Sequence, residues 1–325
     1  MRIVSKGLSY TYNKNTPFAS EALKDVSLTI DEGEFFGIIG HTGSGKSTFI
    51  QHLNGLVPLE RGMLTVGNFN LKKYTKKEYK AIRTPGEIDG ICFENGKKLS
   101  YRKYCKAYLN GIKKLRAKVG MVFQYPEYQL FGETVFADVA FGVKNFFPDY
   151  APEGVERAVK NAIEAVGLDY KEVKDKSPFE LSGGQKRRVA IAGVIVTKPE
   201  VLILDEPLAG LDPQGKAELT SLLHSLHERD VKTIVIVSHD MDDVCENCTK
   251  AAVFSIGKII DCAPPERLFK NPQVLAEKGV EEPVTVYLSS MLEKIGVSLN
   301  TDYKTDDFIN KLTEFYDKSR KTHVK

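Results

Sequence analysis

The segment Gly40-His41-Thr42-Gly43-Ser44-Gly45-Lys46-Ser47 constrains this chain more than any other. It follows a nonpolar run, Phe35–Ile39, which we predict to be a central parallel strand, and a helix is expected from Lys46 to about Leu56. Glycines between a buried strand and a helix let backbone N–H groups close around an anion, and the helix N-terminus adds a positive dipole end. Lys46 is therefore predicted to reach the β- and γ-phosphates of a nucleotide, and Ser47 to bind its Mg²⁺.

A second nonpolar run, Val201–Asp205, ends in two carboxylates. It should deliver Asp205 and Glu206 to the carboxyl edge of the sheet, where ligands of open α/β sheets collect. Asp205 suits Mg²⁺ coordination, and Glu206 suits orienting or deprotonating an attacking water. With a helix over Lys216–Glu228 and a strand over Thr233–Ser238, this run predicts a βαβ unit. Together the features indicate a nucleoside triphosphatase, a class that includes GTPases, kinases, helicases and transporters.

A second anion site is predicted at Leu181-Ser182-Gly183-Gly184-Gln185. Ser182 is suited to cap a helix whose first turn holds the two glycines, so the backbone N–H groups there would attract an anion. The segment is too far along the chain to belong to the first loop, and it therefore needs a phosphate of its own. Taken alone, the pattern fits an ordinary helix cap equally well.

The composition excludes several other classes of protein. No run approaches the ~18 nonpolar residues that span a bilayer, and the N-terminus lacks the nonpolar stretch of a secretory signal. The chain is therefore expected in the cytosol, or at a membrane through a partner.

Five cysteines, an odd number, do not suggest a disulfide framework. Cys245 and Cys248 form a C-x-x-C that lacks the further ligands of a zinc site, and we favour ordinary helix residues over a redox pair.

In their order along the chain, these motifs resemble those of the ABC transporter ATPases. Leu181–Gln185 resembles the family's signature, and Gln124 resembles the Q-loop glutamine. Gly210-Leu211-Asp212 resembles the D-loop, and His239 resembles the switch histidine that contacts the γ-phosphate. Tyr12 lies where the family stacks an aromatic ring on adenine. The resemblance covers about residues 3–260.

The resemblance implies an α/β fold of the P-loop NTPase class, with an antiparallel β subdomain, a helical signature subdomain and a small C-terminal helical extension. Two modules of this family dimerise head to tail, so each ATP lies between the phosphate loop of one module and the signature of the other. The implied nucleotide-binding residues are Tyr12, Gly40, His41, Thr42, Gly43, Ser44, Gly45, Lys46, Ser47, Thr48 and Gln124, and the implied catalytic residues are Glu206 and His239. Ser47, Gln124 and Asp205 would bind Mg²⁺, whereas Leu181, Ser182, Gly183, Gly184 and Gln185 would face the partner's nucleotide, with Asp212 in the D-loop.

Three further segments resemble energy-coupling factor (ECF) transporter ATPases of the cobalt and vitamin uptake type, and among these the second of two paralogous subunits. They are Tyr10–Phe18, the loop variant His41-Thr42 and Phe123–Phe131, and Pro265–Phe269 with Pro283–Thr285 resembles the C-terminal extension of that subfamily. The resemblance implies a peripheral protein on the cytoplasmic side of the cell membrane. Its implied partners are a paralogous ATPase subunit in a heterodimer, a transmembrane scaffold subunit and a membrane protein that captures the vitamin or metal ion.

Two alternative functions stay open. The chain could be the ATPase of another class of ABC importer, because the core motifs are shared. It could also be an ABC protein without a transport role that acts on nucleic acid, although no nucleic acid partner is expected from the subfamily resemblance.

The expected organisation is an ATPase domain over residues 1–263, with a helical subdomain over about 125–198, and a C-terminal extension over 264–325. One departure from the family is an insert over about residues 73–113, which lies in a stretch from Lys72 to Lys118 with fifteen Lys or Arg against four Asp or Glu. Its glycines, Gly86, Gly90, Gly96 and Gly111, favour a turn-rich hairpin over one amphipathic helix. Either a solvated excursion or a contact with anionic lipid or an acidic neighbour would fit this composition.

Overall fold

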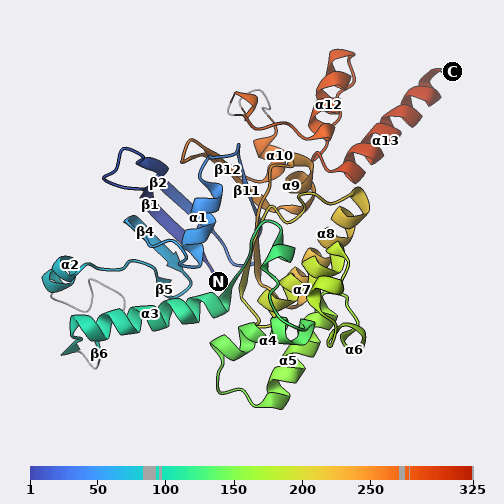
Figure 1. Cartoon of the computed structure of the whole chain (residues 1–325). Coiled ribbons are helices and arrows are strands. Elements are labelled where there is room, and N and C mark those ends of the chain that lie inside the picture. The colour runs from blue at the N-terminus through green and yellow to red at the C-terminus, as the bar shows by residue number, and fades with distance from the viewer. Residues whose placement is uncertain (83–92, 95–96, 271–274, 278, 324–325) are drawn as a thin grey trace.

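A six-stranded sheet forms the centre of the molecule (Figure 1). The computed structural model describes residues 1–82, 93–94, 97–270, 275–277 and 279–323. The strands lie in the order β12-β11-β3-β10-β9-β8, and every neighbouring pair is parallel except β11 with β12. Their bounds are β3 Phe35–Ile39, β8 Val119–Val122, β9 Val201–Asp205, β10 Thr233–Val237, β11 Lys250–Ser255 and β12 Lys258–Ala263. The predicted parallel sheet and its central strand are thereby confirmed.

Alternate side chains of the central strands enter two different nonpolar cores. On β3, Phe36 and Ile38 pack in one core with helix α1, Lys46–Leu53. Phe35 and Ile39 pack in the other core with helices α7, Gly183–Ile195, and α8, Pro213–Arg229. This division follows from the period of two residues along a strand, and it puts α1 and α7 on opposite faces of the sheet.

An antiparallel sheet covers the face of the central sheet that α1 occupies. Its strands lie in the order β2-β1-β4-β5, with bounds β1 Ile3–Tyr12, β2 Ser20–Ile30, β4 Arg61–Val66 and β5 Phe69–Asn70. Nonpolar residues of β1, β2 and β4 share the core of α1.

Helices cover the other face. They are α4 Val135–Phe146, α5 Pro152–Ala165, the short α6 Tyr170–Val173 and α7, with 3-10 turns η3 Pro126–Gln129 and η4 Pro178–Glu180. The expected helical subdomain is thus made of elements that share one core with α8.

The C-terminal extension is helical, as expected, and docks on α9, Met241–Asn247. It contains α10 Pro265–Leu268, α12 Val284–Lys294 and α13 Thr305–His323. Asp242 Oδ1 of α9 accepts a hydrogen bond from Val284 N at 2.8 Å, and Glu246 Oε1 accepts one from Thr305 N at 2.6 Å. No helix in the part of the chain that the structure describes combines the length and hydrophobicity that crossing a bilayer requires.

The insert contains a long helix, so the expectation of a turn-rich hairpin in place of an amphipathic helix is wrong for this part. We call the described residues 72–82, 93–94 and 97–118 the arm, which contains α2 Lys76–Ala81, β6 Phe93–Glu94, β7 Lys97–Lys98 and α3 Tyr101–Lys118. Gly111 lies inside α3, whereas Gly86, Gly90 and Gly96 lie outside the described residues. A helix forms here instead of turns because four nonpolar or aromatic side chains recur on one helical face. They are Tyr104, Tyr108, Ile112 and Leu115.

Tyrosines hold the arm together in a small core of its own. Tyr104 is fully buried, its ring stacks on that of Tyr79 at 4.7 Å between centroids, and its hydroxyl accepts a hydrogen bond from Tyr74 N at 2.8 Å. Tyr79, Ile82, Tyr104 and Tyr108 form this cluster, which is distinct from the two main cores.

Replacing Tyr104 with alanine is expected to loosen the arm and to spare the central sheet. Removal of a buried aromatic ring typically costs about 3–5 kcal/mol, and the loss falls on the arm's own core. Amide hydrogen exchange over residues 101–112 should therefore rise, with exchange in β3 unchanged. Tyr104→Phe, which removes only the hydroxyl, is the matched control and should have the smaller effect. Equal exchange in wild type and the alanine variant would show that this ring does not hold the arm.

Candidate nucleotide site

Four neighbouring strands end at one edge of the central sheet, and each is followed by a residue with a predicted role. Gly40 follows β3, His239 follows β10 by one residue, Glu206 follows β9, and Gln124 follows β8 by one residue. The register fixes their depth, because Val237 of β10 lies opposite both Ile38 of β3 and Asp205 of β9. The carboxyl edge of an open parallel sheet is where such folds bind ligands.

The loop over residues 40–47 is held tightly against the rest of the chain. A Cβ on Gly40, which has a φ of 142°, would lie 2.1 Å from Phe254 O, and a Cβ on Gly45, with a φ of 105°, would lie 2.5 Å from Ala22 O. Only glycine fits these two contacts and these backbone angles. A hydrogen bond from Gly257 N to Ser44 O, at 2.9 Å, also ties the loop to the strand hairpin behind it.

Lys46 lies across this loop. Its buried ammonium donates hydrogen bonds to Gly40 O at 2.6 Å and to His41 O at 3.0 Å. Burial lowers the pKa of Lys46, and the nearby carboxylates of Glu206 and Asp205 oppose this change. The ammonium is thus positioned between the loop backbone and the two acids at the end of β9.

Glu206 is held from two sides. Gln124 Nε2 donates a hydrogen bond to Glu206 Oε2 at 2.8 Å, and His239 Nδ1 lies 3.4 Å from Glu206 Oε1. The backbone of Glu206 is left-handed, with a φ of 49°, and so is that of Tyr125, with a φ of 53°. Such backbone strain costs on the order of 1–3 kcal/mol per residue and is concentrated at functional sites. The strained turn and the two side chains together fix the carboxylate at the sheet edge.

Oxygen donors suited to a magnesium ion also lie at this edge. The Ser47 side chain is hydrogen bonded to the half-buried Asp205 carboxylate; burial raises the pKa of Asp205, and this hydrogen bond opposes the change. Among the described residues, no three or more His, Cys, Asp or Glu side chains gather in a metal-binding cluster. This donor set fits Mg²⁺, which uses one or two carboxylates and completes its shell with substrate phosphates and water.

Tyr12 lies beside the helix that begins in the loop. Its hydroxyl is 3.3 Å from Thr48 Oγ1, and its exposed ring packs edge-on against Tyr10, with 4.8 Å between centroids. The structure therefore places Tyr12 and Thr48 beside the loop.

The signature and the D-loop are not part of this cluster. Ser182 caps α7, with Gln185 N donating to Ser182 Oγ at 3.3 Å and Ser182 N donating to Gln185 Oε1 at 3.1 Å, so these two residues bond to each other within the cap. Gly183 and Gly184 are exposed. Asp212 is exposed and caps α8, where its carboxylate accepts a hydrogen bond from Gly215 N at 2.8 Å.

Arg187 is a structural link that sequence reasoning missed. The guanidinium is buried, pairs with Glu127 at 3.3 Å and donates hydrogen bonds to Pro207 O and Ala209 O. It thereby ties the signature helix to the segments that follow Gln124 and Glu206. The sequence indicated a buried position for Arg187, because it lies on the same helical face as two nonpolar residues, Ile191 and Ile195.

The C-x-x-C pair belongs to the core, in agreement with the simpler of the two interpretations. Burial raises the pKa of the Cys245 thiol to about 12 and also raises that of Cys248. Because the thiolate is the reactive form, neither side chain is suited to redox chemistry.

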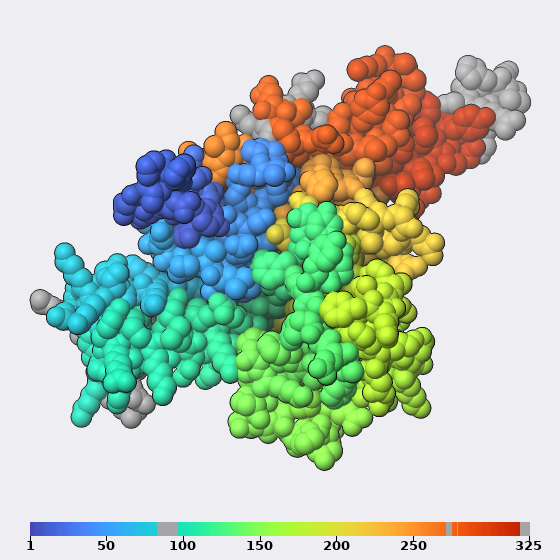
Figure 2. Space-filling model, in the orientation of Figure 1, coloured from blue at the N-terminus to red at the C-terminus, as the bar shows by residue number. Residues whose placement is uncertain are grey.

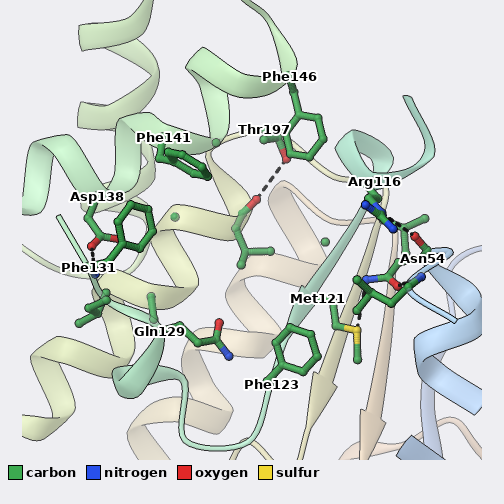
Figure 3. Close-up of a pocket in the computed structure, with 18 residues that line it drawn as sticks. Asn54, Arg116, Met121, Phe123, Gln129, Phe131, Asp138, Phe141, Phe146 and Thr197 are labelled. Atoms are coloured by element: carbon green, nitrogen blue, oxygen red, sulfur yellow. Dashed lines mark hydrogen bonds between the residues drawn. The ribbon is translucent and has the colours of Figure 1, made fainter. Parts of the chain in front are cut away.

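A groove of about 290 Å³ lies between β8, the end of α1 and helices α4 and α7 (Figure 3). On one wall Phe131 and Phe141 pack edge-to-face at 5.0 Å, and both rings are exposed. On the other wall Arg116 donates hydrogen bonds to Asn54 O and Gly55 O. The groove is therefore a surface with exposed aromatic rings on one side and a hydrogen-bonded wall on the other.

Comparisons with known proteins agree with this arrangement. The sequence profile of the ABC transporter family matches residues 23–209, which contain the loop, Gln124, the signature and Glu206. The energy-coupling factor transporter ATP-binding protein EcfA2 of Clostridium tetani is 42% identical over 305 residues, which cover 94% of this chain and 93% of that protein.

Two solved structures are similar as well. The structure of cbiO1 from Clostridium perfringens, described as part of the ABC transporter complex cbiONQ, has a TM-score of 0.65 and 34% identity, and the match covers 89% of this chain and 98% of that chain. An ATP-binding cassette in a dimeric post-hydrolysis state with ADP and Pi has a TM-score of 0.62 and 25% identity over 81% of this chain and 98% of its own. The chain is therefore an ABC-type ATPase that belongs to the ABC transporter family and, within it, to the energy-coupling factor transporter ATP-binding proteins.

Proposed function

We propose that this chain binds Mg-ATP at the edge formed by β3, β10, β9 and β8, and that hydrolysis powers an energy-coupling factor importer for vitamins or transition-metal ions. The observation that carries the proposal is the convergence of Lys46, Asp205, Glu206, Gln124 and His239 at one edge of the sheet. The names of the similar proteins support the transport role.

The residues of the site divide the chemical work. Backbone N–H groups of the loop and the Lys46 ammonium bind the phosphates, and the side-chain oxygens of Ser47, Gln124 and Asp205 are suited to hold Mg²⁺, which when bound neutralises phosphate charge. Glu206 orients the attacking water and accepts its proton, because its carboxylate is the one that Gln124 and His239 hold. The exposed ring of Tyr12 stacks on the adenine.

The second half of the site comes from a paralogous ATPase subunit. The central sheet separates α1 from α7, so the signature of this chain faces away from the core that supports its own loop. A Cβ on Gly183 or Gly184 would meet nothing within 4 Å in this chain, which suggests that a second molecule requires their lack of side chains. A similar solved cassette is a dimer.

The groove beside α4 receives a cytoplasmic segment of a transmembrane scaffold subunit. Exposed Phe131 and Phe141 offer aromatic surface to such a segment. This docking holds the chain on the cytoplasmic side of the cell membrane as a peripheral subunit. A separate membrane protein captures the transported substrate.

Glu206→Gln is expected to retain ATP binding and to slow turnover by ~10²-fold or more, because the amide cannot accept the proton of the attacking water. ATP affinity and steady-state phosphate release of the assembled complex measure the two effects. Lys46→Ala is the comparison variant and should lose ATP binding itself. Wild-type turnover in the glutamine variant would show that Glu206 does not accept the proton of the attacking water.

Ser182→Arg should silence the nucleotide site of the partner subunit and leave this chain's own site intact. The exposed position of Ser182 on α7 means that the arginine points to the partner instead of unfolding this chain. Crosslinking of a photoreactive ATP analogue to each subunit of the heterodimer distinguishes the two sites. Loss of labelling on this chain with normal labelling on the partner would contradict the composite site.

Phe141→Asp is expected to abolish co-purification with the transmembrane scaffold, because a carboxylate in the groove removes an aromatic contact and places a charge there. ATP binding by the isolated chain should not change. Tyr150→Asp, at an exposed aromatic side chain outside the groove, is the matched control and should leave co-purification intact. Equal recovery of the scaffold with both variants would rule out docking in this groove.

A further inference from the structure

The arm carries an unbalanced positive charge. It is the teal projection in Figure 2. Its described residues include fourteen Lys or Arg and two acidic residues, Glu78 and Glu94. Twelve of the fourteen basic side chains are exposed, and among the described residues only Lys118 of this set forms a salt bridge, with Glu200. Glu78 is occupied in the capping box of α2. The arm therefore presents an exposed basic surface with few acidic partners among the described residues.

Helix α3 sorts its side chains into two faces. Tyr104, Tyr108 and Leu115 are buried on the inner face. Arg102, Lys106, Leu109 and Lys113 follow one another at spacings of four, three and four residues, which puts them on one outer stripe. All four are exposed, and Leu109 is 62% exposed between basic neighbours. The outer stripe thus offers three basic groups that attract anionic headgroups, with one nonpolar side chain between them.

Three tyrosines of the arm point inward, which argues against nucleic acid as the anionic partner. Tyr79, Tyr104 and Tyr108 are each less than a tenth exposed, and their rings pack on one another. Binding of single strands relies on exposed aromatic rings on which bases stack. These three rings are therefore not available as a platform on which bases stack.

The arm also borders the groove proposed for the transmembrane scaffold. A second hollow of about 480 Å³ lies between α3 and the end of α4, lined in part by Lys73, Leu109 and Lys113. It shares Leu56, Arg116 and Phe146 with the first groove, so the two are continuous. If the first groove receives a segment that emerges from the bilayer, the outer stripe of α3 lies next to the membrane surface.

We propose that the arm is a membrane-contact element, in which the stripe Arg102, Lys106, Leu109 and Lys113 binds anionic lipid headgroups beside the docked scaffold. The orientation of the arm rests on the proposed function, whereas its affinity for lipid does not. Most of the exposed charges are spread over α2, β7 and α3, and of the exposed basic residues described in the arm only Lys73 and Lys113 line the hollow beside α4. This spread suits a two-dimensional array of phosphates better than a single acidic peptide, and it makes the attraction additive and sensitive to salt.

The test is co-sedimentation of the full chain with vesicles of phosphatidylglycerol and phosphatidylcholine, or of phosphatidylcholine alone, at low and high salt. The variant combines Arg102→Gln, Lys106→Gln and Lys113→Gln. The matched control combines Lys6→Gln, Lys171→Gln and Lys294→Gln, which removes the same charge at exposed positions elsewhere. Each basic residue near an anionic surface contributes roughly five-fold in affinity, so the stripe variant should bind the anionic vesicles about 100-fold more weakly at low salt. The control should bind within about three-fold of wild type.

Three outcomes overturn the proposal. They are equal binding of wild type and the stripe variant, equal binding of wild type to neutral and anionic vesicles, and retention on polyglutamate or an oligonucleotide without retention on anionic vesicles. ATP binding by the same preparations is measured in parallel and should be unchanged in both triple variants. A failure of ATP turnover with the paralogous subunit would refute the proposed function and leave a positive vesicle result in place, so the two failures are distinguishable.

Discussion

Backbone hydrogen bonding between β3, β10, β9 and β8 is the constraint on which the candidate site depends. Parallel pairing sets the end of each strand at a common depth, with Val237 opposite Asp205 and Val122 opposite Leu204. The ladder continues past the strands, because Glu206 N donates to Val237 O and Ser238 N donates to Ile38 O. Residues from four distant segments therefore meet without any long side chain reaching across the sheet. The nonpolar character of the strands, which are buried on both faces, is the physical source of this alignment.

Strained backbone and close packing also occur at this edge. Gly40 and Gly45 leave no room for a side chain against Phe254 O and Ala22 O, and Glu206 keeps a left-handed backbone that the surrounding hydrogen bonds maintain. These features make the edge rigid. Preorganised donors and carboxylates are effective in phosphoryl transfer because they need little rearrangement when charge develops. The helical elements pack on the sheet through a shared nonpolar core, and Arg187 and Glu127 add a polar link between the signature helix and the segments that follow Gln124 and Glu206.

The main departure from the sequence expectations is the helix of the arm, which forms despite its glycine. Glycine content favoured turns, yet α3 is continuous through Gly111 because its inner face packs in the tyrosine cluster and its last turn enters the main core through Leu115. A glycine inside a helix costs only about 1 kcal/mol, which burial of three aromatic rings easily exceeds. The sequence displayed these tyrosines and lysines as one mixed segment, and only packing separated them into a buried face and an exposed one.

The sequence alone determined the identity of the chemical groups and the strands that carry them. A glycine-rich loop after a nonpolar strand, and two carboxylates after another, have few other physical uses, so the fold class and the roles of the loop, Asp205 and Glu206 followed from local pattern. The roles of Tyr12, Gln124, His239 and Asp212 followed from the resemblance to a family. The tertiary structure decided which of them meet. Gln124, Glu206 and His239 form one network, whereas Ser182 and Asp212 cap helices apart from it. It also revealed Arg187, the groove and the two faces of α3, because each depends on contacts between segments far apart in the chain, which no local pattern encodes.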